Sequence, residues 1–291
     1  MSSNLINPRS NPTLTVAGGE PLVWGLRTYV MGIINLTPDS FSGDGLANDP
    51  QAAVASALQM ESEGADIIDV GAESTRPGSQ PISAAAEIDR LIPALSAICA
   101  AVSIPVSVDT YKAPVARRAI AAGASLVNDV WGCLADGNMA PTIAAAGVPA
   151  ILMHNQAVAQ YDDLVPDVIS GLDRIAGIAR AAGVAPHNII LDPGIGFGKT
   201  ADHNLELLRR LPEVRQAGYP LLLGVSRKST IGRILNLPPE ERLEGTAAAV
   251  AMSIAGGADI VRVHDVKEMV RVARMTDAIA RDWRPSPWPS R

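Results

Sequence analysis

The sequence predicts a (β/α)8 barrel, a TIM barrel, with a short N-terminal β extension. Eight short apolar runs end in polar or charged residues, and helix-patterned sequence fills most of the gaps between them. A continuous apolar run is typical of a strand buried on both faces, and its alternation with helices favours a parallel barrel. The stretch from Tyr29 to Trp283 also has the length of one such domain, ~250 residues. The expected strands cover residues 29–35, 67–71, 105–109, 126–129, 150–155, 189–192, 221–228 and 260–264.

A single domain accounts for nearly the whole chain. We expect residues 1–12 to be a disordered tail, residues 13–283 the barrel, and residues 284–291 a C-terminal tail. Hydrophobic residues make up 47% of the 291, enough for a large core, whereas aromatic residues make up only 3%. The core therefore has to consist mainly of Ala, Val, Leu and Ile. Phe41 and Phe197 lie in Gly-rich polar loops, where each either serves the site or simply anchors its loop.

The charge balance narrows the class of partner. The net charge is −6, which argues against a nucleic-acid partner. Arg76, Arg227, Lys228 and Arg262 nevertheless lie at or just after expected strand ends, and the active site of such a barrel lies at those ends. A local group of cations on an acidic protein favours a small anionic ligand.

The cysteine content and the apolar runs bear on the cellular compartment. Cys99 and Cys133 do not form a metal-binding spacing, so we expect free thiols in a reducing compartment. No apolar run reaches the roughly 18 residues of a membrane span, and no signal peptide precedes the domain. We therefore expect a cytoplasmic protein with no membrane partner.

The first barrel strand follows a predicted hairpin and leads into a polar loop. Residues 13–27 contain Gly18 and Gly19 between β-prone runs, so a hairpin that closes the bottom of the barrel is expected. Asn35 ends the first strand, and the loop that follows, to residue 45, has the Gly content of a lid. The amide oxygen of Asn35 suits a hard cation or a phosphate partner, although Asn is also a common turn residue. Pro50 then starts a helix over residues 51–63.

The second and third strands place an arginine and an aspartate at the mouth. Glu73 follows the second strand, and Arg76 beside the hydroxyl of Thr75 suits a phosphate or carboxylate, although a solvated loop arginine is the alternative. A helix is expected over residues 84–101, kinked at Pro93. The third strand ends at Asp109, which either faces the site or caps the helix over residues 115–122.

The next three strands contribute an amide, a histidine and a glycine-rich loop. The fourth strand carries Asn128, the fifth ends near His154, and a helix over residues 165–182 follows. After Asp192, three glycines at alternate positions let the backbone approach a ligand closely. Their spacing does not match a P-loop, and this excludes a nucleoside triphosphate site of that kind.

The last two strands complete the mouth. Residues 226–230 supply two cations and several hydroxyl groups, which is typical of the anion site after strands 7 and 8 of such barrels. Helices are expected over residues 246–255 and 266–282. Arg262 and His264 alternate along the eighth strand, so both should point into the mouth. His187 and His203 are expected at the surface.

These residues resemble the dihydropteroate synthase family from Met31 to about Asp282. Seven motifs carry the resemblance, and their order along the chain makes it specific. They read Met-Gly-Ile-Ile-Asn-Leu-Thr-Pro-Asp-Ser-Phe-Ser, Glu-Ser-Thr-Arg-Pro-Gly, Ser-Val-Asp-Thr-Tyr-Lys, Val-Asn-Asp-Val, Asp-Pro-Gly-Ile-Gly-Phe-Gly-Lys, Ser-Arg-Lys-Ser and Arg-Val-His-Asp. The family is a (β/α)8 barrel and usually a homodimer, which agrees with the pattern of strands and helices.

The resemblance implies a transferase with two small-molecule substrates. It would join 4-aminobenzoate to 6-hydroxymethyl-7,8-dihydropterin diphosphate with Mg2+, giving 7,8-dihydropteroate and pyrophosphate. The positions that match the family's pterin site are Asp109, Asn128, Asp192 and Lys228, with Arg262 stacked on the pterin. The diphosphate and Mg2+ end is matched by Asn35, Arg76, Arg262 and His264, and the aminobenzoate end by Phe41, Thr75, Pro77, Lys228 and Ser229.

Two further residues and five roles complete the expected site. Met153 and Phe197 are expected to line the substrate pocket. A catalytic role is expected for Asp109, Asp192, Lys228, Arg262 and His264, which would stabilise the charges that form as pyrophosphate leaves.

Two departures from the family pattern bear on sulfonamides, which mimic aminobenzoate. Asp44 is shifted by one place, because the loop reads Ser-Gly-Asp-Gly where the family usually has Ser-Asp-Gly-Gly. Thr230 stands where the family usually has Phe or Met, at a position expected near the aminobenzoate pocket. Both changes bear on whether the enzyme is a sulfonamide-insensitive variant.

Three other functions remain open from the residues. A methyl-tetrahydrofolate-binding domain would share the deep Asp and Asn positions but not the Thr-Arg-Pro-Gly and Ser-Arg-Lys-Ser clusters. A Schiff-base aldolase would use Lys228, with its pKa lowered by Arg227. A non-catalytic pterin-binding protein would not need the cationic cluster.

Overall fold

The computed structural model describes residues 13–17, 19–37, 49–74 and 80–288. Several positions predicted from the sequence lie outside these ranges: the N-terminal tail of residues 1–12, Phe41 and the shifted Asp44 of the first loop, and Thr75, Arg76 and Pro77 of the second.

Eight parallel strands form a closed barrel, as the sequence predicts. They are β3 (Tyr29–Asn35), β4 (Ile67–Gly71), β5 (Val106–Asp109), β6 (Leu126–Asp129), β7 (Ala150–Met153), β8 (Ile189–Asp192), β9 (Leu222–Leu223) and β10 (Ile260–Val263). Neighbouring strands pair in the order β8-β7-β6-β5-β4-β3-β10-β9. A parallel bridge between Leu191 and Leu221 joins the two ends of this order, and the Leu191 N–H donates to Pro220 O at 2.9 Å. The barrel therefore has no open edge between β8 and β9.

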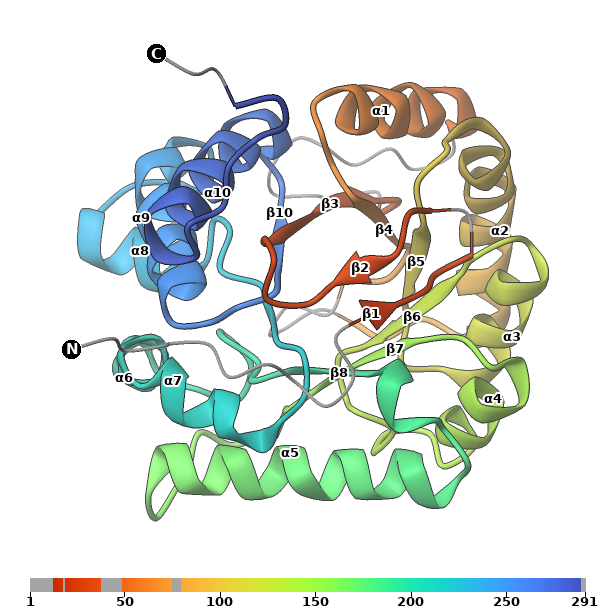
Figure 1. The fold of residues 1–291 in the computed structure, drawn as a ribbon. Coiled ribbons are helices and arrows are strands. Elements are labelled where there is room, and N and C mark those ends of the chain that lie inside the picture. Colours follow the sequence, from red (N-terminus) through yellow and green to blue (C-terminus); the bar gives the residue numbers. More distant parts are fainter. Residues whose placement is uncertain (1–12, 18, 38–48, 75–79, 289–291) are drawn as a thin grey trace.

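Helices surround the strands (Figure 1). They are α1 (Pro50–Ser62), α2 (Ala84–Ala101), α3 (Ala113–Ala121), α4 (Met139–Ala146), α5 (Leu164–Ala181), α6 (Ala201–Arg209), α7 (Leu211–Val214), α8 (Ser229–Leu235), α9 (Leu243–Ala255) and α10 (Val266–Ala280). α1 begins at the predicted place because Asp49 Oδ1 accepts from the N–H groups of Gln51 and Ala52, each at 3.0 Å. α2 continues through Pro93 over its whole predicted range.

The seventh strand is much shorter than the predicted range of residues 221–228. Only Leu222 and Leu223 pair with β10, and the chain then leaves the ladder. Arg227 has φ of 54°, in the left-handed region, which is incompatible with a continuing strand. This turn brings Lys228 and Ser229 to the start of α8, so the residues after β9 belong to a loop at the mouth.

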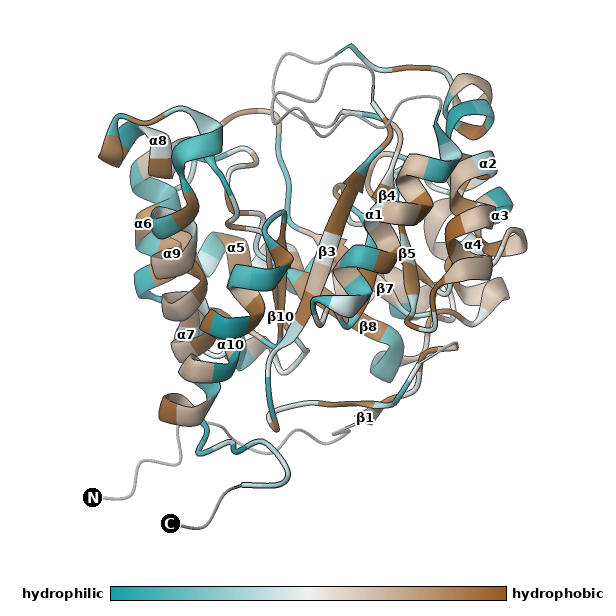
Figure 2. Ribbon diagram, turned by 90° about the horizontal axis from the view of Figure 1, so that it is seen from above, coloured by the Kyte–Doolittle hydropathy of each residue, from teal (hydrophilic) through white to brown (hydrophobic). Residues whose placement is uncertain are grey.

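The bottom of the barrel is filled with apolar side chains. β1 (Thr13–Leu14) and β2 (Leu22–Val23) form the predicted antiparallel hairpin, and Figure 2 shows β1 lying across one end of the barrel. A buried cluster joins the hairpin to residues that begin the barrel strands: Leu14, Val16, Leu22, Trp24, Tyr29, Met31, Ile67, Leu126, Ile151, Ile190, Leu222 and Ile260. A larger cluster packs the outside of the strands against the helices. Among the described residues, these side chains close the bottom of the barrel to small molecules.

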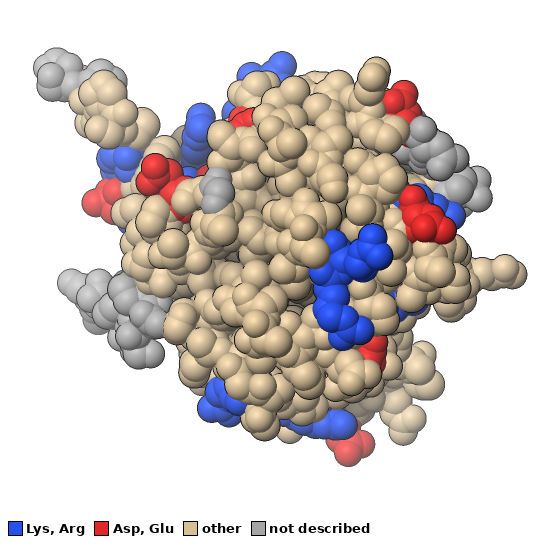
Figure 3. All heavy atoms as spheres, turned by 90° about the vertical axis from the view of Figure 1, so that its right-hand side faces the viewer, with Lys and Arg blue, Asp and Glu red and all other residues tan. Residues whose placement is uncertain are grey.

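No helix in the described ranges is long and apolar enough to cross a membrane. On the side of the molecule shown in Figure 3, Lys and Arg side chains form small groups between uncharged side chains. That face presents no continuous basic surface.

Candidate active site

A cavity of about 370 Å3 opens at the C-terminal ends of the barrel strands. The described residues that were assigned a catalytic, substrate-binding or metal-binding role all line this cavity: Asn35, Asp109, Asn128, Met153, Asp192, Phe197, Lys228, Ser229, Arg262 and His264. They converge because parallel strands deliver their last residues to the same end of the barrel. Phe41, Thr75, Arg76 and Pro77 lie outside the described residues.

Arg262 is held between two carboxylates. Its Nε donates to Asp69 Oδ2 at 2.6 Å, and its Nη2 donates to Asp109 Oδ2 at 2.8 Å. The alternative role of Asp109 as a helix cap is wrong, because α3 has Lys112 at its N-cap position. The two ion pairs fix the plane of the Arg262 guanidinium group at the cavity wall.

Asp69 is a site residue that the sequence reasoning missed. It lies within β4, is fully buried, and also accepts from Asn128 Nδ2 at 2.9 Å. The available signal was an aspartate inside the apolar run Ile67–Gly71, since a buried charge has to be paired. Asp69 therefore orients both Arg262 and the Asn128 amide.

The carboxylates keep acceptor capacity for a ligand. Asp69 Oδ1 and Asp109 Oδ1 are buried and have no hydrogen-bond partner among the residues that the structure describes. A buried acceptor without a donor costs free energy, so a ligand N–H that reached it would bind favourably. Burial also raises the pKa of Asp109, more than the neighbouring Arg262 lowers it. A cation or an N–H donor at this point of the cavity would favour the ionised form.

Asp192 begins the glycine-rich loop. Its Oδ1 accepts from the Gly194 N–H at 2.7 Å. Burial raises the pKa of this carboxyl, and the Gly194 N–H and the Lys228 charge oppose that rise. Asp192 and Asp109 end different strands and line the same cavity. Burial desolvates both carboxyl groups, and each has a cation nearby.

The glycines of this loop serve mainly the fold. Gly194 and Gly198 have positive φ, and a Cβ atom would lie 2.1 Å from His154 O at the first and 2.3 Å from Gln156 O at the second. Of the three predicted to admit a ligand, only Gly196 lines the cavity. Close approach of backbone to backbone, rather than to a ligand, accounts for the other two.

Lys228 and Phe197 contact each other at the wall of the cavity. The Lys228 Nζ lies 4.2 Å from the centre of the Phe197 ring, within the range of a cation–π contact. Because Phe197 also lines the cavity, its side chain faces the site and does not merely anchor the loop.

His264 and two arginines complete the mouth. Ser226 Oγ lies 3.0 Å from the ring nitrogen His264 Nδ1 and accepts from the backbone N–H of His264 at 3.2 Å. These two contacts fix the imidazole. Arg227 pairs with Asp265 through Nε and Nη2, at 3.1 and 2.5 Å. Arg242, which precedes α9 and was not predicted, donates to Arg227 O at 3.0 Å and lines the cavity. Of the cations that were predicted to converge at the mouth, Arg227 and Arg262 are thus each paired with carboxylates.

Two residues expected at the mouth face elsewhere. His154 packs on Gly171 of α5 and lies 3.1 Å from Lys199 Nζ, and burial lowers its pKa to about 4. The Thr230 hydroxyl accepts from Asn204 of α6, and Thr230 lines a separate apolar cavity of about 340 Å3. Thr230, which was expected near the aminobenzoate pocket, therefore does not line the mouth cavity.

The oxygen donors at the mouth suit a cation that is shared with substrate phosphates, rather than a metal ion that is held by protein side chains alone. Within the described ranges, no group of three or more His, Cys, Asp or Glu side chains is placed to hold a metal ion. Asn35 offers one amide oxygen at the cavity. Mg2+ commonly takes one or two protein ligands and completes its shell with water and substrate phosphates, so Asn35 fits such an ion.

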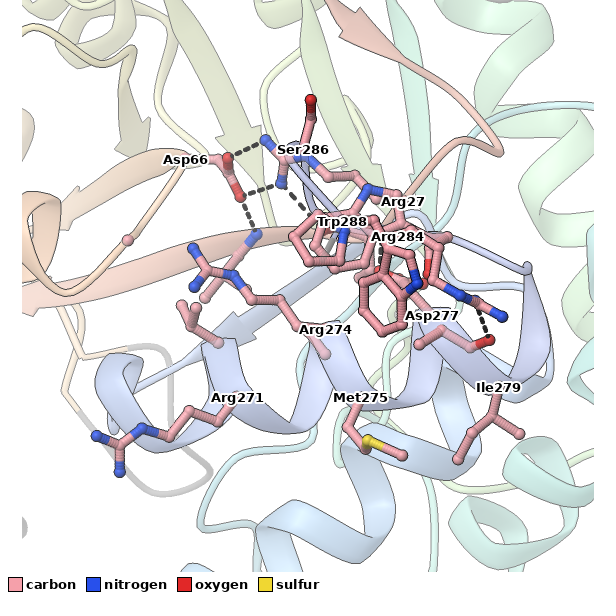
Figure 4. A pocket seen from close by; sticks show the side chains of 18 residues that line it. Arg27, Asp66, Arg271, Arg274, Met275, Asp277, Ile279, Arg284, Ser286 and Trp288 are labelled. Atoms are coloured by element: carbon pink, nitrogen blue, oxygen red, sulfur yellow. Dashed lines mark hydrogen bonds and ion pairs between the residues drawn. The ribbon is translucent and has the colours of Figure 1, made fainter. Parts of the chain in front are cut away.

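A larger cavity lies elsewhere among the described residues. It measures about 990 Å3 and lies between α10 and the C-terminal segment, residues 283–288 (Figure 4). Its carboxylates are already satisfied: Asp66 binds Arg27, and Asp277 accepts from Thr28. Acceptors with unused capacity, rather than volume, single out the barrel mouth as the candidate active site.

Comparison with known proteins agrees with this geometry. Residues 31–264 match the family described as pterin binding enzyme. The dihydropteroate synthase of Clostridium beijerinckii is 54% identical over 265 residues, which cover 91% of this chain and 98% of that protein. Dihydropteroate synthase from Clostridium difficile, solved in the presence of pteroic acid, has a TM-score of 0.85 and 48% identity, covering 89% of this chain and 98% of that one. The Xanthomonas albilineans enzyme with 4-aminobenzoic acid has a TM-score of 0.86 and 40% identity, covering 93% and 98%.

Proposed function

Because the chain belongs to the family of pterin-binding enzymes, we propose that it is a dihydropteroate synthase. It is a transferase that joins 6-hydroxymethyl-7,8-dihydropterin diphosphate to 4-aminobenzoate and releases 7,8-dihydropteroate and pyrophosphate. The observation that carries this function is the single cavity at the barrel mouth, where buried carboxylates and cations from most of the strands meet.

The deep end of the cavity suits a pterin. A pterin edge presents amino and ring N–H donors together with a carbonyl acceptor. Asp109 Oδ1 has no hydrogen-bond partner among the described residues, and Asp192 lines the same cavity from another strand, so both carboxylates can accept from such donors. Asn128 Nδ2 donates to Asp69 Oδ2, and this bond fixes the orientation of the Asn128 amide and therefore of its oxygen. Lys228 is the donor placed for the carbonyl.

Arg262 is suited to stack on the pterin ring. Its guanidinium group is planar, and its two ion pairs to Asp69 and Asp109 hold it without blocking its faces. A preorganised guanidinium also needs no rearrangement when charge develops on a leaving group. One side chain can thus contact the ring and the diphosphate.

The outer end of the cavity suits the diphosphate. Asn35, Arg262, His264 and Arg242 all line the cavity and supply an amide oxygen, two cations and an imidazole for such a group. We propose that Mg2+ binds here with Asn35 as a protein ligand, where it neutralises charge on the diphosphate. On the strength of the family motifs alone, we propose that Arg76 contacts the diphosphate. On the same ground we propose that the aminobenzoate is contacted by Phe41, Thr75 and Pro77.

The reaction needs charge stabilisation more than a strong base. As the C–O bond to pyrophosphate breaks, Arg262 and His264 stabilise the negative charge on the leaving group. The exocyclic methylene carbon becomes positive, and the carboxylates of Asp109 and Asp192 stabilise that charge. The neutral aryl amine then attacks this carbon, forms the C–N bond and loses a proton to water. Lys228 and Ser229, which line the cavity, would hold the aminobenzoate, as the family motifs imply.

The other functions lose their support. In a Schiff-base aldolase, Arg227 would lower the pKa of Lys228, but Arg227 is paired with Asp265. A methyl-tetrahydrofolate-binding domain would not need the Ser-Arg-Lys-Ser motif after β9, which here supplies Lys228 and Ser229 to the cavity. A storage protein would not need the cationic cluster, of which Lys228 and Arg262 line the same cavity.

We further propose that the enzyme is a cytoplasmic homodimer. Cys99 and Cys133 are free thiols, which suits a reducing compartment. α8, α9 and α10 lie side by side (Figure 1) and expose large apolar residues, Ile234, Leu235, Met252, Met275 and Ile279. Exposed apolar side chains of this kind on neighbouring helices are typical of an interface between subunits.

Pyrophosphate release tests the proposed function directly. The complete reaction contains the enzyme, the pterin diphosphate, 4-aminobenzoate and Mg2+, and each component is then omitted in turn. The proposal expects release only in the complete mixture. Release that does not depend on 4-aminobenzoate would point to a hydrolase and overturn the proposal.

A further inference from the structure

A hydrogen-bonded bridge joins two segments behind the cavity. The Gly196 N–H donates to Asn204 Oδ1 at 2.8 Å, and Asn204 Nδ2 donates to Thr230 Oγ1 at 3.0 Å. Asn204 lies on α6 and is 2% exposed, while Thr230 is the second residue of α8 and is 6% exposed. The Asn204 amide therefore uses both of its ends to tie the glycine-rich loop to the start of α8.

The two segments that this bridge joins meet at the cavity. Gly196 precedes Phe197, and Thr230 follows Lys228 and Ser229. A Cβ atom on Gly196 would lie 3.1 Å from Lys228 Cδ, so loop and lysine are already in contact. The contact of Lys228 Nζ with the Phe197 ring, at 4.2 Å, depends on the same spacing.

The surroundings of the bridge argue for a geometric role. The cavity of about 340 Å3 beside Asn204 and Thr230 is lined mainly by apolar residues, among them Ile195, Leu208 and Ile231. A buried amide in such surroundings costs free energy unless it is fully paired, whereas an apolar side chain would pack without that cost. An amide that is bonded at both its oxygen and its nitrogen instead sets one fixed distance between the two segments.

We propose that Asn204 and Thr230 are positioning residues that set the spacing between the segment carrying Phe197 and the segment carrying Lys228 and Ser229. Through that spacing they determine the affinity for aminobenzoate. This inference rests on the proposed function and adds to it two residues that do not line the mouth cavity.

The test compares two variants that lose the same kind of bond. Thr230→Val keeps the shape of the side chain and removes the hydroxyl, whereas Thr230→Ser keeps the hydroxyl. Thr142→Val is the matched control, because Thr142 is also 6% exposed and also accepts one bond at 3.0 Å, from Arg117 Nη1. Thr142 lies on α4 and does not line the mouth cavity.

The bridge predicts a change in KM without an equal change in kcat. Thr230→Val should raise the KM for aminobenzoate about 5-fold, the effect of one hydrogen bond, and should leave kcat within about twofold. Thr230→Ser and Thr142→Val should both stay within about twofold of the wild-type KM. Hydrogen exchange of the peptide spanning residues 194–200 should become faster in Thr230→Val and remain unchanged in Thr142→Val.

Each outcome decides one question. Equal KM values for Thr230→Val and Thr142→Val, or a Thr230→Ser variant as impaired as Thr230→Val, would overturn the positioning role. If Thr230→Val does not fold, Asn204→Leu is decisive in the same assays, and a wild-type KM there would also overturn it. A wild-type enzyme that releases no pyrophosphate would instead refute the proposed function.

Discussion

Arg262 reaches across the barrel mouth to Asp109, and its Nη2 lies 2.8 Å from Asp109 Oδ2 although 153 positions separate the two residues. The same guanidinium binds the fully buried Asp69. This arrangement ties the last barrel strand to the second and third through the residues that the reaction needs. Stability and activity are therefore linked at this point of the molecule.

Arg262→Ala should cost stability as well as activity. The change leaves Asp69 and Asp109 buried without their cation, and the loss of one partner of a buried ion pair typically costs about 3 kcal/mol or more. Pyrophosphate release should fall close to background. Denaturant unfolding of the variant and the wild type measures the first effect, and an unfolding free energy within about 0.5 kcal/mol of wild type would show that the ion pairs do not stabilise the barrel.

The cost of Arg262→Ala should grow with pH. The pKa of Asp109 is already raised by burial, and removal of the guanidinium raises it further. A carboxyl with a raised pKa contributes stability below its unfolded pKa and loses that contribution as pH rises through the folded value. The difference in unfolding free energy between variant and wild type should therefore be larger at pH 8 than at pH 5.

Asp192→Asn should separate charge from structure. The Asn oxygen can still accept from the Gly194 N–H, so the unfolding free energy should change by less than about 1 kcal/mol. The negative charge facing the positive methylene carbon is lost, and kcat should fall by about 100-fold. Steady-state kinetics and denaturant unfolding of one preparation check both parts. A kcat near that of wild type would remove Asp192 from the catalytic residues.

Lys199 should make the stability of the enzyme rise with pH above neutrality. Burial lowers the pKa of Lys199 to about 7, from 10.5 in the unfolded chain. Between these values the unfolded chain binds more protons than the folded one, so the unfolding free energy rises with pH. The slope is a fraction of the about 1.4 kcal/mol per pH unit that one full proton gives.

Lys199→Met should remove that slope. The measurement is denaturant unfolding of both proteins at pH 7, 8 and 9, where the gain of the wild type over its value at pH 7 should exceed that of the variant. Parallel curves would show that Lys199 stays protonated in the fold, held by the backbone oxygen of Phe197 and by His154.

Thr230 should have little effect on the selectivity between aminobenzoate and sulfonamides. Its hydroxyl faces Asn204 and not the mouth cavity, so it meets neither ligand directly. A substitution of Thr230 shifts the segments that carry Phe197 and Lys228, and these segments face both ligands. The affinities for aminobenzoate and for sulfonamides should therefore change in the same direction and by similar factors. In Thr230→Phe, the ratio of the sulfonamide inhibition constant to the aminobenzoate KM should therefore change by less than about tenfold. A Gly43/Asp44 exchange should change the ratio more, and a reversed order of the two effects would contradict this ranking.

The fold was predictable because a barrel strand is buried on both faces. Such a strand reads as an apolar run, and β3, β4, β6 and β8 have the predicted bounds. α4 and α8 were not predicted because they are short, and α4 is apolar on all sides, which hides the helical period. The overlong seventh strand has a similar cause, since the apolar run after Leu221 continues past the ladder and the turn at Arg227 leaves no signal in composition.

The site was predictable where strand ends determine it. Asp109, Asn128, Asp192 and Arg262 meet because parallel strands end at one face. Asp69 escaped notice because it lies inside a strand, and Asn204 and Arg242 because they lie on or before helices far from any strand end. The direction in which His154 and Thr230 point depends on packing against α5 and α6, which no local pattern records.

The most direct test of the enzymatic function is the stoichiometry of the two products. Pyrophosphate and 7,8-dihydropteroate are quantified in the same reaction, with the wild type and with Asp192→Asn as the folded control. One dihydropteroate is expected for each pyrophosphate with the wild type, and greatly reduced amounts of both are expected with the variant. Pyrophosphate formed without dihydropteroate, or equal activity in the two proteins, would contradict it.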